Sequence, residues 1–176
     1  MSGSAVCDLG SGCGVLSIGS ALVGAAYVCG IEIDEDAVQL ALQNCDEMFE
    51  EERETPIDFI NARVDSNSSS VLFGRFSNLF DVVIMNPPFG TKGNAGADYK
   101  FLKEAINLVR PGGNIYSLHK SSTRDFFKKQ MASVTENLCI TGEVLAEVRY
   151  DLPKCYKFHK EKSVDIAVDF WHFQKL

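Results

Sequence analysis

The sequence predicts an α/β protein: an open, mostly parallel seven-stranded sheet with helices on both faces and an antiparallel hairpin at the C-terminal edge. Apolar, β-rich runs alternate with amphipathic stretches, and a glycine-rich turn follows the first run. Such alternation favours a parallel sheet, whereas the last two runs, separated only by a loop, are expected to pair antiparallel. The length of 176 residues predicts one domain spanning 1–176.

The first half of the chain supplies three expected strands and two helices. In Asp36–Phe49, apolar residues recur at helical spacing, while the shorter apolar runs are rich in β-forming residues. We expect strands at Ala5–Asp8, Tyr27–Ile33 and Ile57–Ile60, and helices at Val15–Val23 and Asp36–Phe49.

The second half adds four strands and two helices. Phe80–Met85 is almost continuously apolar, as in a strand that is buried on both faces. The helix that ends near Val109 is expected to stop at Pro111-Gly112-Gly113, because proline and glycine break helices. The expected strands are Phe80–Met85, Asn114–Leu118, Leu138–Arg149 and Ser163–Phe173, and the expected helices are Phe101–Val109 and Ser122–Ser133.

The charge of the chain is unevenly distributed. The formal net charge is −7, and the sequence pI of about 4.9 taken alone argues against a nucleic-acid partner. However, residues 1–54 hold eleven of the 24 acidic residues and one of the 17 basic residues, so residues 55–176 carry a net positive charge. Such asymmetry is typical of a protein with two different partners, although a solvated acidic helix gives the same pattern.

No segment predicts a membrane span, a secretory signal or a metal site. The longest apolar run, Ala21–Ile31, is far shorter than the roughly 18–20 residues of a span, and no basic residue precedes Arg53. The six cysteines form no C-x-x-C pair, and the three histidines lack neighbouring ligands. We therefore expect reduced thiols, no bound metal, and a protein of the cytosol or nucleus.

A glycine-rich loop follows the first expected strand. Asp8-Leu-Gly-Ser-Gly-Cys-Gly14 places three glycines at alternate positions, and Glu32 stands at the end of the next strand. Glycines let a ligand lie against the backbone, and an acid at the second strand can accept hydrogen bonds from a ribose diol. The G-x-G-x-G spacing favours a pyrophosphate clamp less than G-x-G-x-x-G does.

A second motif, Asn86-Pro-Pro-Phe89, follows the strand Phe80–Met85. The two prolines lack backbone donors, so the segment offers carbonyl oxygens, and Asn86 adds an amide oxygen. These acceptors suit the two hydrogens of an exocyclic amine, and Phe89 offers a flat face for stacking a base. A plain strand-to-loop turn is the alternative.

These two motifs resemble those of Rossmann-like class I methyltransferases: motif I of the S-adenosylmethionine-dependent enzymes and the N-P-P-[FYW] signature of amino-methyltransferases. The resemblance implies S-adenosyl-L-methionine as cofactor. It places the ribose hydroxyls at Glu32. It assigns the rest of the cofactor to Asp8, Gly10, Gly12, Cys13, Gly14 and Leu16. The implied catalytic residues are Asn86, Pro87, Pro88 and Phe89, where Asn86 and the Pro87 carbonyl bind the target nitrogen.

Longer strings resemble the eukaryotic methyltransferase-like protein 5 family, which methylates N6 of one adenosine in 18S ribosomal RNA. The matching strings are Met85–Lys92, Ser117–Arg124, Arg149–Pro153 and Tyr156–Lys160. The resemblance implies an RNA adenine-N6 methyltransferase of the nucleus (nucleolus) and cytoplasm. It also implies a small zinc-containing activator subunit, which forms a heterodimer through the Ile57–Val64 edge strand.

Basic and aromatic residues are interleaved late in the chain. This mixture suits phosphate contacts and base stacking, although an ordinary charged loop has the same composition. The expected substrate-binding residues are Tyr156, Lys157, Phe158 and Lys160, extended by Lys120 and Arg124.

The sequence departs from the family pattern in two features. The family's aspartate that reads the cofactor adenine aligns with Arg63, so Asp65 or the backbone of Val64 is expected to take over this contact. Family members also carry a segment before the glycine loop that helps to close the pocket. Because motif I begins at Asp8 here, we expect a short form whose pocket lacks one wall.

Two other functions remain open. A protein glutamine-N5 methyltransferase uses nearly the same tetrapeptide, although it favours tyrosine at the position of Phe89. A catalytically silent short form that binds the activator or RNA is the third hypothesis.

Overall fold

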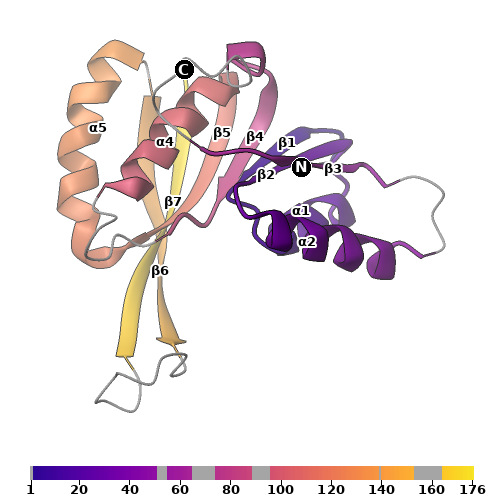
Figure 1. Ribbon diagram of the computed structural model, residues 1–176. Coiled ribbons are helices and arrows are strands. Elements are labelled where there is room, and N and C mark those ends of the chain that lie inside the picture. Colours follow the sequence, from indigo (N-terminus) through magenta and orange to yellow (C-terminus); the bar gives the residue numbers. More distant parts are fainter. Residues whose placement is uncertain (1, 51–54, 65–73, 89–95, 139, 153–163) are drawn as a thin grey trace.

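The computed structural model confirms the predicted architecture (Figure 1) and describes residues 2–50, 55–64, 74–88, 96–138, 140–152 and 164–176. The strands are β1 (Ala5–Leu9), β2 (Tyr27–Glu32), β3 (Ile57–Asn61), β4 (Phe80–Met85), β5 (Val109–Lys120), β6 (Ile140–Leu152) and β7 (Val164–Lys175). They form one sheet in the order β3-β2-β1-β4-β5-β7-β6. β1 to β5 pair in parallel, whereas β7 pairs antiparallel with both β5 and β6.

Helices cover both faces of this sheet, because both faces carry apolar side chains that must be buried. The helices are α1 (Val15–Leu22), α2 (Glu35–Met48), α4 (Ala97–Leu108) and α5 (Arg124–Leu138). Even-numbered residues of β1, β2 and β4, such as Val6, Val28 and Val82, pack with α1 and α2 in one core cluster. Odd-numbered residues of the same strands, such as Cys7 and Val83, pack with α4 and α5 in a second cluster. The period of two in an extended strand therefore separates the two cores.

The start of α4 differs from the prediction. The helix begins at Ala97, four residues before the expected Phe101. Gly96 precedes it with φ +80°, and Asp98 lies in its first turn, where a carboxylate interacts favourably with the helix dipole. The apolar spacing marked only the part of the helix that packs on the sheet, so the polar first turn was missed.

The predicted helix stop at Pro111-Gly112-Gly113 lies inside β5. Phe80 of β4 pairs with Val109 and Val82 pairs with Asn114, so four residues of β5 bulge opposite Asp81. A Cβ on Gly113 would lie 2.7 Å from the carbonyl oxygen of Asp81, so only glycine fits this approach. The Pro-Gly-Gly run therefore forms a bulge rather than a loop.

The boundary between α5 and β6 also differs. A 3-10 turn, η1 (Ser121–Thr123), precedes α5, and α5 continues to Leu138 rather than ending at Ser133. Leu138, expected in a strand, is therefore helical, and β6 begins at Ile140. The sequence between Ser133 and Leu138 contains no glycine or proline to end the helix early.

Four cysteines of the described chain, Cys7, Cys13, Cys29 and Cys45, have free thiols. Burial raises the pKa of Cys7 well above its ordinary value, so this thiol stays protonated. Within the same residues, no helix combines the length and the apolar character needed to cross a bilayer.

Candidate active site

A cavity of about 500 Å³ lies where the carboxyl ends of β1, β2 and β4 meet the start of α4. This is the edge at which ligands bind in open parallel sheets. Its lining consists of Gly10, Ile31, Glu32, Ile33, Arg63, Val64, Asn86, Pro88, Ala97 and Phe101. The structure thus brings together six predicted site residues from four separate parts of the chain, namely Gly10, Glu32, Arg63, Val64, Asn86 and Pro88.

The glycine loop needs its glycines for two close approaches. Gly10 has φ +74°, its N–H donates to the carbonyl of Ile31 at 2.8 Å, and a Cβ there would lie 3.0 Å from the Phe101 ring. Gly14 has φ +83° at the start of α1, and a Cβ there would lie 3.0 Å from the Phe59 ring. The loop therefore packs directly against α4 on one side and β3 on the other.

Glu32 holds the loop as well as lining the cavity. One carboxylate oxygen, Oε2, accepts a hydrogen bond from the N–H of Gly12 at 2.9 Å. The other, Oε1, accepts from the N–H groups of Ile33 and Asp34 at 2.7 and 2.9 Å. A carboxylate offers about four acceptor sites, so the three bonds that fix the loop leave one site for a ribose hydroxyl.

Asp8 lies under the loop and is fully buried. Its Oδ2 accepts a hydrogen bond from the Ser17 hydroxyl at 2.7 Å, whereas Oδ1 has no hydrogen-bond partner among the described residues. Burial raises the pKa of this carboxyl from 3.8 to about 6, the nearby Glu32 adds to the rise, and the Ser17 bonds oppose it. An unpartnered buried carboxylate oxygen is costly, so this site favours a cationic or hydrogen-bonding ligand next to the loop.

Asn86 follows β4 directly and is exposed at the cavity. Pro87 is buried, and Pro88 is exposed and lines the cavity. The preceding residue, Met85, is buried and pairs with Ser117 of β5. The rigid strand therefore fixes the position from which Asn86 projects, while Phe89 lies outside the described residues.

Not every predicted cofactor residue reaches this cavity. Leu16 is 43% exposed and lines a separate hollow of about 280 Å³ beside α1. Gly12, Cys13 and Gly14 lie in the loop but are not part of the cavity lining. Asp65 lies outside the described residues.

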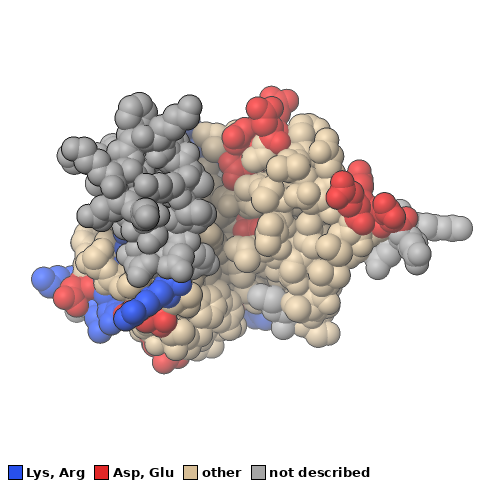
Figure 2. Space-filling model, turned by 90° about the horizontal axis from the view of Figure 1, so that it is seen from below, with Lys and Arg blue, Asp and Glu red and all other residues tan. Residues whose placement is uncertain are grey.

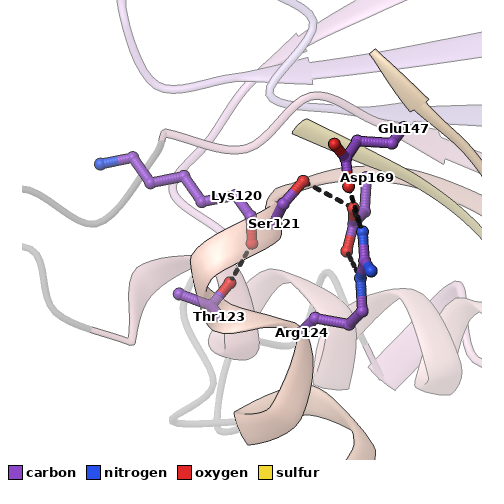
Figure 3. A network of polar contacts seen from close by, with 6 residues as sticks. All are labelled: Lys120, Ser121, Thr123, Arg124, Glu147 and Asp169. Carbon is purple, nitrogen blue, oxygen red and sulfur yellow. Dashed lines mark hydrogen bonds and ion pairs between the residues drawn. The ribbon is translucent and has the colours of Figure 1, made fainter. Parts of the chain in front are cut away.

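Figure 3 shows the two described residues of the predicted substrate surface, Lys120 and Arg124. The Arg124 guanidinium donates two hydrogen bonds to the Asp169 carboxylate, at 2.7 and 2.5 Å, and one to Glu147 at 2.6 Å. These bonds raise the pKa of Arg124 further above its ordinary value. Its fork is thus held by carboxylates rather than free for phosphate, whereas the Lys120 side chain extends away from the network. Tyr156, Lys157, Phe158 and Lys160 lie outside the described residues.

Four cavity residues, Ile31, Ile33, Ala97 and Phe101, were not predicted. Phe101 carried a usable signal, because it opens the apolar stripe of the helix that follows the Asn86 motif. Its contact with Gly10 depends on tertiary packing, so spacing alone does not reveal it.

The charge asymmetry of the sequence reappears in space. Figure 2 shows acidic side chains over the half that holds α1 and α2, and most of the basic ones on the half that holds α5. Across the part of the chain that the structure describes, no three His, Cys, Asp or Glu side chains gather as metal ligands.

Comparisons with known proteins agree with this geometry. Residues 1–166 match the family of the methyltransferase domain. The rRNA N(6)-adenosine-methyltransferase METTL5 of Danio rerio is 48% identical over 169 residues, which is 96% of this chain and 74% of that protein. The chain belongs to the methyltransferase-like protein 5 family. The Drosophila melanogaster member, named in the same way, is 44% identical over 98% of this chain and 74% of its own length.

A solved structure shares the fold of the chain. A proposed RNA methyltransferase of Pyrococcus horikoshii superposes with a TM-score of 0.72 at 31% identity. The match covers 99% of this chain and 76% of that one. The chain is therefore a class I methyltransferase in both sequence and fold.

The site fits the S-adenosyl-L-methionine that this family and fold imply. The cavity volume is in the range of small-molecule sites. Glu32 at the end of β2 can accept from the ribose, and the glycine loop lets the methionine part approach the backbone. Asp8 lies beneath the glycine loop and does not line the cavity, so its carboxylate supports the loop that the cofactor would contact.

Proposed function

We propose that this chain transfers a methyl group from S-adenosyl-L-methionine to N6 of an adenosine in ribosomal RNA, specifically 18S rRNA. The single observation that carries the proposal is the 48% identity to the zebrafish rRNA N(6)-adenosine-methyltransferase across 96% of the chain. The position of Asn86 and Pro88 at the cavity supports it. We also propose that the enzyme acts in the nucleus (nucleolus) and cytoplasm, where this RNA is made and used.

Asn86 and Pro87 orient the target amine in this proposal. The side-chain oxygen of Asn86 and the backbone carbonyl of Pro87 each accept one N–H of the exocyclic amine. Both hydrogens are then held, and the nitrogen lone pair points toward the cofactor, which supplies an electrophilic methyl group when bound. The same two oxygens stabilise the positive charge that grows on the nitrogen during attack. Phe89 stacks the base.

The cavity lining supports a mechanism without a strong general base. Its ionisable side chains, among the described residues, are Glu32 and Arg63. Glu32 already accepts three backbone N–H groups, and arginine stays protonated. The amine proton is therefore released only after the nitrogen has become cationic, when its acidity is high enough for water to take it.

The test is parallel transfer of tritiated methyl groups to ribosomal RNA and to a translation release factor, with the activator present. The proposal predicts label in RNA. Label in the release factor alone supports the glutamine-N5 alternative, and no transfer to either supports a catalytically silent form.

Lys120 is expected to contact an RNA phosphate. It ends β5 at the same edge as Asn86, because β4 and β5 are parallel, and its ammonium is free of the Arg124 network. Lys120→Glu should lower RNA affinity about tenfold at low salt and reduce the slope of log K against log[salt] by about one. Titrations at several salt concentrations measure this slope.

Arg75→Glu is the matched control for Lys120→Glu. Arg75 is also exposed, but it precedes the amino end of β4 and thus lies at the opposite edge of the sheet. Equal losses of slope in the two variants would place the RNA surface elsewhere.

We further propose that a small zinc-containing activator subunit pairs with β3. This strand is the outer strand of the sheet, and an unpaired edge is a site for strand addition. The N–H of Ala62 donates to Glu32 on β2 at 2.8 Å, so the N–H of Asn61, one residue earlier in an extended chain, points to the free side.

Asn61→Pro removes this outward donor and should weaken activator binding at least tenfold. Asn61→Ala loses the side-chain contacts of Asn61 with Glu32 and Ile33 but keeps the backbone donor, so it should bind almost normally. Co-purification and calorimetric titration measure both variants. Equal binding by both would exclude backbone pairing at this position.

A further inference from the structure

A buried polar set lies beside β4 but outside the cavity lining. The Ser117 hydroxyl and the His119 Nε2 are 2.5 Å apart on one face of β5. His119 Nδ1 is 3.7 Å from a carboxylate oxygen of Asp98, in the first turn of α4. Ser117 and His119 are 1% and 0% exposed, and Asp98 is 6% exposed.

β5 anchors both ends of the stretch that contains Asn86, by strand pairing at Met85 and through the polar set at Asp98. At one end, Met85 pairs with Ser117. At the other end, α4 begins at Ala97, and Asp98 faces His119, two residues beyond Ser117 on the same strand. The chain thus leaves β4 at Asn86 and contacts β5 again at Asp98.

The start of α4 forms part of the cavity. Ala97 and Phe101 line it together with Asn86 and Pro88. The contact between Asp98 and His119 therefore sets a wall of the cavity without lining it, because Asp98 lies on the buried side of the same helical turn.

A serine, a histidine and an aspartate together suggest nucleophilic catalysis, but burial excludes this role. The Ser117 side chain is almost fully covered, and none of the three residues lines the cavity. The Phe127 ring packs on the imidazole, with 4.0 Å between the ring centroids. No substrate atom can reach this serine in the folded protein.

The protonation states define the direction of the hydrogen bonds. Burial lowers the pKa of His119, against the opposing effects of Asp98 on α4 and Asp169 on β7, while Phe127 of α5 adds no charge. The pKa of Asp98 is lowered overall, because the contact with His119 and backbone N–H groups outweigh its burial. A neutral imidazole then accepts from the Ser117 hydroxyl at Nε2, and its Nδ1–H faces the Asp98 carboxylate at 3.7 Å, beyond hydrogen-bond distance.

We propose that Asp98 and His119 are positioning residues that hold the start of α4 on β5 and thereby keep the cavity wall and the Asn86 motif in register. This inference rests on the proposed amine-binding role of Asn86. An apolar pair of similar size would pack here at no cost in desolvation, but it would not specify one geometry.

The test compares His119→Leu, which removes the polar contacts, with His119→Asn, whose amide N–H takes the place of Nδ1–H. In His119→Leu, kcat for rRNA methylation should fall about thirtyfold while the KM for RNA changes less than threefold, because an error in position of about 1 Å is costly in the transition state. His119→Asn should recover at least a third of the wild-type kcat. Asp98→Asn, which removes the charge of the partner, should resemble His119→Leu.

His172→Asn is the matched control. His172 Nδ1 also lies 3.7 Å from a carboxylate, that of Glu143, and its Nε2 contacts Asn114, but Glu143 lies on β6 rather than on α4, which forms the cavity wall. It should keep kcat within twofold of wild type. A loss equal to that of His119→Leu, or no recovery in His119→Asn, would overturn the proposal.

Hydrogen–deuterium exchange makes the outcome independent of the proposed substrate. Amides at 97–101 should exchange about tenfold faster in His119→Leu and Asp98→Asn than in wild type, and at wild-type rates in His172→Asn. Unchanged exchange overturns the positioning role. If the variants show the predicted exchange pattern but the wild-type chain transfers no methyl group to rRNA, the result counts against the proposed function alone.

Discussion

Asn86→Ala is expected to lower kcat for rRNA methylation by about 10²–10³ while leaving the Kd for S-adenosyl-L-methionine within threefold of wild type. The variant removes an acceptor that orients the amine and stabilises its developing charge, and such preorganised groups act mainly in the transition state. Cofactor affinity is expected to persist, because Glu32, Gly10 and Phe101 remain in the cavity lining. Single-turnover kinetics and calorimetry measure the two quantities.

Asn86→Asp serves as the control for this loss. It keeps a side-chain oxygen at nearly the same place, so it should retain more activity than Asn86→Ala at every pH above the carboxyl pKa. If Asn86→Ala keeps most of its turnover, the proposed role of the tetrapeptide is wrong.

Asp8→Asn is expected to stabilise the fold at pH 7 while weakening cofactor binding. The folded-state pKa of about 6 lies above the value of 3.8 expected for an exposed aspartate, so the folded protein holds the proton more tightly than the unfolded chain. The free energy of unfolding of wild type therefore falls as the pH rises from about 4 to about 6. Asparagine cannot ionise, so Asp8→Asn lacks this fall. The free energy of unfolding of the variant relative to wild type is therefore larger at pH 7 than near pH 4 by on the order of 3 kcal/mol.

Urea unfolding at pH 4 and pH 7 measures this difference, and calorimetry measures the cofactor affinity, which should drop at least tenfold. Asp81→Asn is a control of opposite sign. A backbone bond from Ala5 and the Arg110 contact lower the pKa of Asp81, so neutralising it should destabilise the fold at pH 7. A wild-type pH dependence in Asp8→Asn would show that Asp8 does not titrate near 6.

The fold and the centre of the site could be predicted because both depend on local patterns. Each strand is a short apolar run, and Glu32 and Asn86 stand immediately after such runs, where the carboxyl ends of parallel strands meet. Arg63 and Val64 line the same cavity, but they were expected there only because the family's adenine-reading aspartate aligns with Arg63. Periodicity and strand polarity therefore sufficed for Glu32 and Asn86, whereas Arg63 and Val64 needed the family resemblance.

The remaining features depend on tertiary packing. Leu16 is close to the glycine loop in sequence, yet the turn into α1 directs it to a different hollow. Arg124 was predicted from the sequence to bind phosphate, but its guanidinium donates hydrogen bonds to Asp169, 45 residues later in the chain. The pair formed by Asp98 and His119 joins the first turn of α4 to the far end of β5, so no spacing rule reveals it.

Methylation of adenosine N6 in 18S rRNA is tested most directly by nucleoside analysis of this RNA after incubation with the wild-type chain, its activator and labelled S-adenosyl-L-methionine. We expect the label to elute as N6-methyladenosine and to be lost with Asn86→Ala. Label in any other nucleoside, or in protein glutamine instead of RNA, would contradict it.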